Sequence, residues 1–492
     1  MPTAAVWFRS DLRVHDHLAL EAAAKSGLGH LACIYVVDPR AFADSRELGQ
    51  PRCGAHRASF LGQSVEALRE RLRAMGSDLL VVVGEPEEVL PQLANEHEIA
   101  ELHFHRRVGS EEQAIEAHLE AALQQAGVKT LAHWDWTLVD PETLPFAAAD
   151  TPATFSSFRR KAERVVASSG FPAPVAAPER LPPPPSGLLQ SASAADLMPW
   201  SGTDAAGGLA GGEQAGLDRV QRWVWQRDAL RSYKETRNGM VGDDYASRFS
   251  PWLAHGCLSP RFVQSEVERY ERERVRNAST GWLTVELLWR DYFQFVSLQN
   301  GSSVFASSGL RGVPVPWRPD DKFARAQFDA WCEGRTGYPI VDANMRELAA
   351  TGFLSNRGRQ IVASFLTKNL GLDWRWGAEW FERQLVDYDV GSNWGNWNYA
   401  AGVGNDARGF RYFDLANQAR KYDADGEHAR LWCPEISKLP DDLVHAPHEL
   451  SREQQARYGC TLGADYPAPI IDLAASVRTN RERWEAAMAR AR

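Results

Sequence analysis

The chain has 492 residues, enough for two or three domains, and its 44% apolar and 24% charged shares are those of a globular protein. No apolar run approaches the ~18 residues of a membrane span, so we expect no membrane partner. The net charge of −9 argues against a surface coated with phosphate contacts, although it leaves room for a local basic groove.

The first residues contain no basic segment followed by a long apolar stretch, which argues against a signal peptide. The six cysteines are scattered and form no C-x-x-C pair, so we expect no zinc or other metal site and no disulfide framework. The cytoplasm is the expected location, or an organelle or the nucleus in a eukaryotic cell, because no targeting signal is visible. We expect a monomer.

Residues 1–140 have the pattern of an α/β domain. Short apolar runs alternate with helical patterns, the clearest of which covers 55–75. This alternation predicts a doubly wound parallel sheet. The first strand-to-helix turn, 9–13, lacks the G-x-G-x-x-G of dinucleotide-binding folds, so nucleotide binding by this domain has little support. The expected strands are 4–8, 31–37, 79–83, 101–105 and 129–133.

Residues 141–216 predict a long, poorly packed linker. It contains a run of four prolines at 182–185 and a stretch at 201–216 dominated by Gly, Ala and Ser, with one helical pattern at 155–166. Strand signals vanish from 217 to 492, which predicts an all-helical domain that holds the functional site. The expected helices are 219–233, 260–276, 283–299, 323–334, 342–351, 357–369, 374–386 and a short charged one at 478–492.

The most informative stretch is 374–397, which places five tryptophans around Asp387, Asp389 and Asn393. A plain aromatic core would exclude these polar groups, because burying them without partners is costly. The stretch therefore indicates a large, polar and partly aromatic ligand, with tryptophans close enough to pass electrons to it.

Asn356 and Arg359 are three residues apart and share one face of a predicted helix. This face is either a solvated basic surface or a site where Arg359 pairs with a buried carboxylate beside a ligand, with Asp387 and Asp389 as candidates. The motif by itself favours neither.

Glu286, Trp289 and Arg290 line one face of another predicted helix. One interpretation is a half-buried stripe with an internal ion pair. The other is a carboxylate that accepts hydrogen bonds from a flipped base stacked on the indole. By itself the motif favours the first interpretation.

Tyr233 precedes a segment, Ser247-Arg248-Phe249-Ser250, that stands just before a proline. Two hydroxyls and an arginine at the start of a helix can hold phosphates. An ordinary N-cap explains the same residues, since Ser before Pro is a common helix start. The motif alone favours the cap.

Together these motifs resemble the photolyase/cryptochrome family, most closely its cryptochrome DASH group, from Trp7 to about Asp472. The resemblance implies an α/β plus all-α protein, in which a Rossmann-like photolyase domain is joined by a long linker to a helical FAD-binding domain. Its most specific segments are 7–16, 233–240, 249–254, 286–293, 336–339, 342–348, 355–360 and 395–399.

The resemblance further implies a noncovalent FAD, and a photoreduction chain from Trp397 through Trp374 to Trp317. It places Asn393 opposite flavin N5. An amide does not readily give up a proton, so we expect Asn393 to favour reduced flavin, the state used in repair. The implied FAD-binding residues are Tyr233, Ser247, Arg248, Phe249, Ser250, Arg290, Asn356, Arg359, Asp387, Asp389 and Asn393.

Glu286 and Trp289 match the family's damage-pocket pair, which holds a flipped cyclobutane pyrimidine dimer. Relatives that repair duplex DNA carry Met and Trp where this chain has Gln360 and Tyr399, and the smaller ring and polar wall weaken that pocket. Flipping costs less from a single strand, so we expect dimers in single-stranded DNA as substrate. The expected activity is that of a blue-light-driven deoxyribodipyrimidine photo-lyase, and the weakened pocket argues against repair of duplex DNA.

Arg107 stands where relatives that bind methenyltetrahydrofolate have a Glu, which argues against a folate antenna and leaves another antenna or none. Ala246 replaces a usual Ser or Thr beside the phosphate hydroxyls. Two other functions stay open. One is a blue-light photoreceptor that signals through a partner without DNA repair, and the other is a flavoprotein oxidoreductase that works in the dark.

Overall fold

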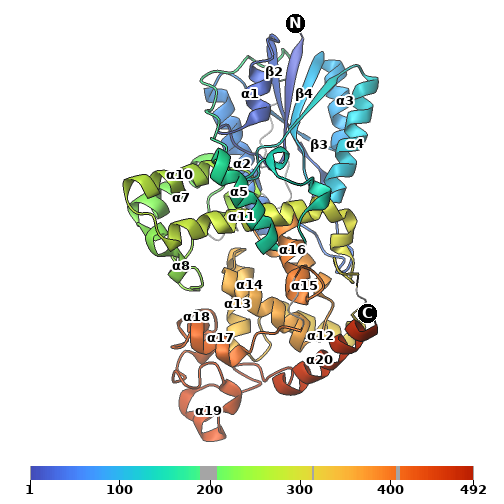
Figure 1. The fold of residues 1–492 in the computed structure, drawn as a ribbon. Coiled ribbons are helices and arrows are strands. Elements are labelled where there is room, and N and C mark those ends of the chain that lie inside the picture. The colour runs from blue at the N-terminus through green and yellow to red at the C-terminus, as the bar shows by residue number, and fades with distance from the viewer. Residues whose placement is uncertain (1, 189–207, 313–314, 406–409, 491–492) are drawn as a thin grey trace.

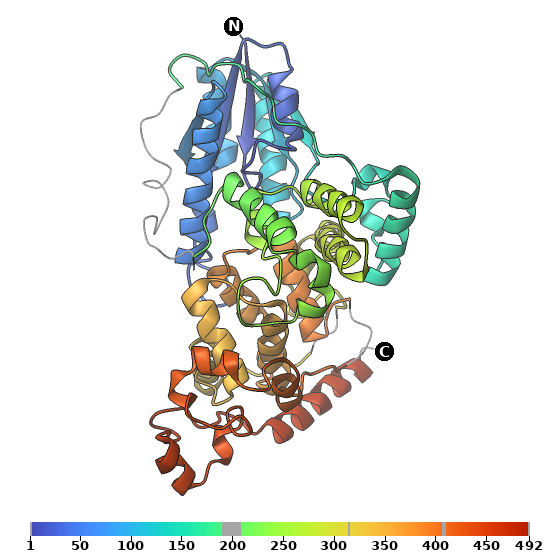
Figure 2. The same cartoon turned by 90° about the vertical axis from the view of Figure 1, so that its left-hand side faces the viewer.

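The computed structural model describes residues 2–188, 208–312, 315–405 and 410–490. Figure 1 shows an α/β part at the N-terminal end and a larger group of helices beneath it, and Figure 2 gives the view turned by 90°. The fold class expected from the sequence, α/β followed by all-α, is confirmed.

Five parallel strands form the sheet, in the order β3-β2-β1-β4-β5. They are β1 (Thr3–Phe8), β2 (His30–Val37), β3 (Leu79–Val83), β4 (Ile99–His105) and β5 (Lys129–His133), so each expected strand is present. Side chains alternate along β1: Ala4, Val6 and Phe8 enter one apolar core, and Ala5 and Trp7 enter another. Both faces of the sheet are therefore covered.

Helices cover the two faces in pairs. Residues of α1 (Leu18–Ala24) and α2 (Ala55–Ala74) belong to the first core, and those of α3 (Pro86–Glu96) and α4 (Ser110–Gln125) belong to the second. This arrangement is the doubly wound sheet that the sequence predicted.

The segment predicted to be a poorly packed linker contains a well-packed helix, so that part of the prediction is wrong. Helix α5 (Phe155–Ser169) extends past the predicted end and buries Phe155, Phe158 and Ala162 along one stripe. These side chains join the core that also includes residues of the helical part. Residues 189–207, which include the first part of the small-residue stretch, lie outside the described residues, and the boundaries at 140 and 216 stay predictions.

From residue 208 onward the described residues form helices joined by loops, with no strand and one isolated bridge between Leu462 and Tyr466. The expected helix 219–233 is broken: a π-helical turn (Gln221–Gln226) and a 3₁₀ turn (Ala229–Ser232) flank Asp228, whose φ is +53°. The α-helices are α7 (Glu213–Val220), α8 (Tyr233–Thr236), α9 (Ser250–Ala254), α10 (Pro260–Glu273), α11 (Ala278–Asn300), α12 (Lys322–Cys332), α13 (Pro339–Thr351), α14 (Asn356–Ser364), α15 (Trp374–Gln384), α16 (Val390–Ala401), α17 (Leu415–Tyr422), α18 (Glu427–Trp432), α19 (Arg452–Tyr458) and α20 (Leu473–Arg490).

The turn after β1 joins the two parts of the protein. The backbone N–H of Leu12 donates to the His255 carbonyl, and the Arg13 guanidinium donates to the Gly256 carbonyl. Gly256 has a φ of +68°, and a Cβ there would lie 2.1 Å from the carbonyl oxygen of Ser10. Only glycine allows this close approach, so the turn that lacks a nucleotide-binding motif serves as a contact between domains.

No helix in the described ranges is long and apolar enough to cross a membrane. The six cysteines are buried and form no disulfide. Burial raises the pKa of the Cys257 thiol to about 11, which keeps this side chain protonated.

Candidate functional site

The helical part encloses a cavity of about 490 Å³, within the range of roughly 300–1,000 Å³ that is common for ligand sites. The eleven residues assigned by resemblance to FAD all line it, and so do the four assigned to the damaged base. The structure therefore brings together segments that are far apart in the sequence. The predicted residues in its wall are Tyr233, Ser247, Arg248, Phe249, Ser250, Glu286, Trp289, Arg290, Asn356, Arg359, Gln360, Asp387, Asp389, Asn393, Trp397 and Tyr399.

Arg359 pairs with Asp387, and this confirms the interpretation of the sequence in which Arg359 contacts a buried carboxylate. The Nη2 atom of Arg359 lies 2.9 and 2.7 Å from the two carboxylate oxygens of Asp387. The Asp387 side chain is 2% exposed and that of Arg359 is 29% exposed. The pair thus buries its carboxylate while the guanidinium stays at the cavity wall.

Asp389 has a structural role at the start of α16, where it accepts the backbone N–H of Ser392 at 2.7 Å. It also accepts the Gln294 amide at 2.6 Å. Gln294 was not predicted, although it follows Arg290 by one helical turn. Asn393, one turn into α16, donates from Nδ2 to the Ala378 carbonyl at 3.0 Å, which orients its amide.

The N-cap interpretation of the serine motif is wrong. The N-cap position of α9 is occupied by Phe249, whose side chain makes no capping hydrogen bond. The Ser247 and Ser250 hydroxyls line the cavity instead. Arg248 has a φ of +54°, donates to the Asp243 carboxylate and the Gly242 carbonyl, and keeps a buried Nε without a hydrogen-bond partner among the described residues. This wall therefore offers hydroxyl and guanidinium donors to an anionic ligand.

The ion pair expected within α11 does not form. Arg290 donates to the Trp136 carbonyl, and burial lowers the pKa of its guanidinium. Glu286 instead forms an ion pair with Arg237, whose Nη2 is 2.6 Å from Oε1. The Trp282 indole N–H donates to the same oxygen at 2.8 Å. Sequence reasoning missed both partners.

Trp289 lies in an aromatic group at the cavity wall. Phe155 from α5 stacks on it with 3.7 Å between ring centroids, and Tyr399 meets it edge-on at 6.4 Å. Gln360 lines the same cavity from α14. The packed helix of the linker segment therefore supports the predicted base-stacking residue.

The three tryptophans assigned to photoreduction occupy different depths. Trp397 lines the cavity, Trp374 is fully buried and Trp317 is partly exposed. The indole N–H groups of Trp374 and Trp317 both donate to the Ser307 carbonyl. Trp331 also approaches Trp397, with 6.4 Å between ring centroids.

Arg107 packs against the buried Trp136, with its guanidinium carbon 4.6 Å from the ring centroid. Its backbone N–H donates to Glu116. The Arg107 side chain, whose position the resemblance associates with a folate antenna, is thus placed over an aromatic ring.

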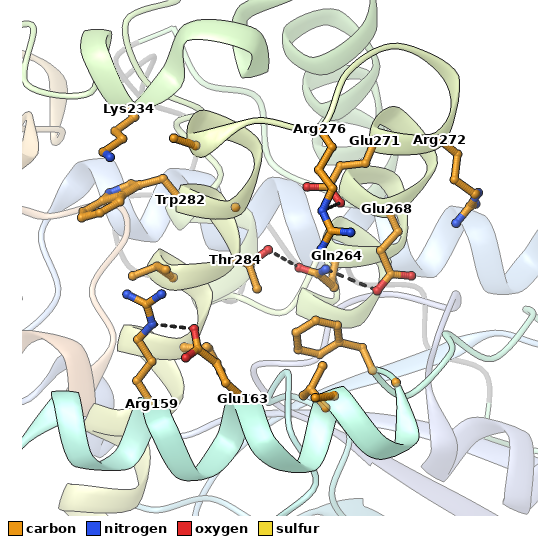
Figure 3. Close-up of a pocket in the computed structure, with 18 residues that line it drawn as sticks. Arg159, Glu163, Lys234, Gln264, Glu268, Glu271, Arg272, Arg276, Trp282 and Thr284 are labelled. Carbon is orange, nitrogen blue, oxygen red and sulfur yellow. Dashed lines mark hydrogen bonds and ion pairs between the residues drawn. The ribbon is translucent and has the colours of Figure 1, made fainter.

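A second cavity, of about 860 Å³, lies between α5, α10 and α11 (Figure 3). None of the site residues predicted from the sequence lines it. Its walls carry both charges, and several of these are paired, as between Arg159 and Glu163 at 2.7 Å. Lys234 and Trp282 form one end of it in Figure 3.

Asp11, His17 and His105 are the one group in the described ranges whose ligand atoms lie close enough to hold a metal ion. The Nδ1 atom of His17 accepts the N–H of Leu20 at 3.0 Å, so a neutral His17 carries its proton on Nε2. That proton faces the Asp11 carboxylate, 3.2 Å away. A protonated ring nitrogen cannot ligate a metal, and the group is better described as a buried ion-pair network.

A parallel α/β sheet beside a helical domain, with a cavity that joins an Arg–carboxylate pair, serine hydroxyls and tryptophans, defines a flavoprotein of the photolyase class. The family described as the FAD binding domain of DNA photolyase matches residues 282–486, and the DNA photolyase family matches residues 4–180.

Cryptochrome DASH of Gloeobacter violaceus is 50% identical to this chain over 99% of it and 96% of the relative. Cryptochrome DASH of Arabidopsis thaliana, described as chloroplastic/mitochondrial, is 44% identical over 90% of this chain and 78% of the relative. A Synechocystis sp. PCC6803 cryptochrome structure superposes with a TM-score of 0.93 at 49% identity, covering 98% of this chain and 99% of that one. The chain belongs to the cryptochrome DASH family.

Proposed function

We propose that this protein is a blue-light-driven photo-lyase that repairs cyclobutane pyrimidine dimers in single-stranded DNA. The observation that carries the proposal is that one cavity is lined both by the residues assigned to FAD and by those assigned to the damaged base. A base held by Glu286 and Trp289 would therefore lie beside the flavin. When bound, reduced FAD would supply the electron that opens the cyclobutane ring and would take it back, so the reaction has no net redox change.

The residues of the cavity fit FAD. Ser247, Ser250 and the Nε of Arg248, which has no partner in the part of the chain that the structure describes, offer donors to its phosphates. The Arg359–Asp387 pair and the Asn393 amide offer polar contacts to a ring system beside Trp397. Each of these roles is a proposal for this chain.

The cavity also fits a flipped base. Five arginines line it against three carboxylates, which gives a locally basic site on an acidic protein. Flipping a damaged base costs a few kcal/mol, and stacking on an indole such as Trp289 returns roughly 1–3 kcal/mol per base. Tyr399 and Gln360 stand in place of a larger ring and an apolar side chain, so the stacking gain is smaller. Because flipping costs less from a single strand, the difference between gain and cost favours single-stranded DNA. A monomeric state and a cytoplasmic location stay predictions.

We propose that no folate antenna binds beside Arg107. Its guanidinium packs on Trp136, which supports a closed wall there. The antenna is then another chromophore or none, and an absorption spectrum of the purified protein distinguishes these two cases.

The test is a repair assay on an oligonucleotide with a single thymine dimer, presented as a single strand and as a duplex to the reduced protein. Restoration of the single strand in blue light, with none in the dark and little for the duplex, is the expected result. The variant Glu286→Ala should repair more slowly than wild type. A photoreceptor without repair activity would restore neither substrate.

A further inference from the structure

The Glu286 carboxylate is held by an ion pair and a hydrogen bond from different elements. Arg237, just after α8, reaches Oε1 at 2.6 Å, and Trp282, one turn before Glu286 on α11, reaches the same oxygen at 2.8 Å. Among the described residues no hydrogen bond to Oε2 occurs. One carboxylate oxygen is therefore committed to the protein, and the other is left for a ligand.

Trp282 itself is fixed from several sides. The Arg237 guanidinium carbon and the Lys234 ammonium each lie 5.3 Å from its ring centroid. Figure 3 shows Lys234 next to the indole at the end of the second cavity. The ring lines that second cavity and not the flavin cavity, so it does not contact a ligand held beside Glu286. Any effect on such a ligand must pass through the Glu286 carboxylate.

We propose that Trp282 is a positioning residue for dimer recognition, a role that rests on the proposed function. With Arg237 it holds Oε1, so that Oε2 is the single acceptor aimed at an N–H group of the flipped pyrimidine. Holding the carboxylate in one rotamer before binding spares the entropy of ordering it during binding. Undamaged DNA places no base in the cavity, so this arrangement does not increase the affinity for it.

The test compares the affinities of wild type, Trp282→Phe, Glu286→Ala and the double variant for single-stranded oligonucleotides with and without one thymine dimer. Binding is measured in the dark by fluorescence anisotropy, so the readout does not depend on repair. The variant Trp282→Phe keeps an aromatic ring and removes the N–H donor. Trp432→Phe is the matched control, because Trp432 is partly buried and lines neither cavity.

Trp282→Phe should weaken binding to the dimer by about tenfold, as expected for a lost hydrogen bond to a charged group, and leave binding to undamaged DNA unchanged. In the Glu286→Ala background the same substitution should have no further effect, because the carboxylate through which it acts is absent. In repair assays, KM should rise more than kcat falls.

Equal losses in both backgrounds would show that Trp282 only supports the fold, and would overturn the inference while the proposed function stands. Wild-type protein that fails to prefer the dimer would overturn the proposed function and the inference with it. If Trp282→Phe does not fold, Arg237→Gln removes the ion pair to Oε1 and should show the same dependence on Glu286.

Discussion

Trp374 and Trp317 donate their indole N–H groups to one acceptor, the carbonyl oxygen of Ser307, at 3.1 and 3.2 Å. Trp374 is fully buried and Trp317 is partly exposed. The shared acceptor thus holds a surface indole beside an interior one. An electron path from solvent to Trp397, at the cavity wall, requires such a step.

Trp317→Phe should slow the photoreduction of bound FAD several-fold, because it removes the outermost oxidisable ring while keeping an aromatic side chain. The loss of the flavin's blue absorption band under illumination with an external thiol reductant measures this rate. Repair by chemically reduced protein should be unchanged, since that reaction does not need the chain. An unaltered photoreduction rate would show that electrons enter by another route, for example through Trp331, which approaches Trp397.

Arg359 and Asp387 should respond unequally to substitution. Arg359→Ala leaves a carboxylate that is 2% exposed without its partner, and we expect a loss on the order of 3 kcal/mol in the free energy of unfolding. Asp387→Asn leaves a guanidinium that is 29% exposed and able to reach water, so its cost should be smaller. Urea titration followed by circular dichroism measures both. Equal losses in the free energy of unfolding would mean that the burial of the side chain left without its partner does not determine the loss.

The flavin content of the same two variants is a separate readout. If the pair contacts FAD, both variants should retain less flavin after gel filtration than wild type. Full flavin occupancy in both would remove Arg359 and Asp387 from the proposed binding residues.

The local patterns were sufficient to predict the five strands and most helices, because each depends on nearby residues. Contacts between distant segments were not predictable. The interpretation that the helix motif favoured placed an ion pair within α11, whereas the ion-pair partner of Glu286 is Arg237, which follows α8. It likewise gave no sign that Phe155, in a segment taken for a linker, stacks on Trp289.

Asn393→Asp should change the flavin state reached under illumination. Asn393 donates from Nδ2 to the Ala378 carbonyl, and an aspartate can make that bond only as the neutral acid. Such an acid can give its proton to the flavin, so we expect the variant to stop at a one-electron-reduced state where wild type reaches the fully reduced one. Absorption spectra during illumination distinguish these states. Similar kinetics and end states in both proteins would count against the role of the amide.

His105 should make the stability of the protein depend on pH. Its Nδ1 lies 2.6 Å from Asp11 and its Nε2 lies 2.8 Å from Asp135. Burial alone would lower the pKa of His105, but the carboxylates of Asp135 and Asp11 outweigh it and raise the pKa from 6.5 to about 9. Since the pKa is higher in the folded state, the stabilisation is complete below the ordinary pKa and is lost as the pH rises through about 9.

His105→Gln removes the positive charge that faces both carboxylates, so it should lower the free energy of unfolding on the order of 3 kcal/mol near pH 6, with a smaller difference above pH 9. Urea unfolding between these pH values measures the difference. His118→Gln, at an exposed position on α4, is the control and should follow wild type at each pH. A difference between His105→Gln and wild type that stays constant with pH would show that His105 contributes packing and no charge, because only a group that titrates differently in the folded and unfolded states gives stability a pH dependence.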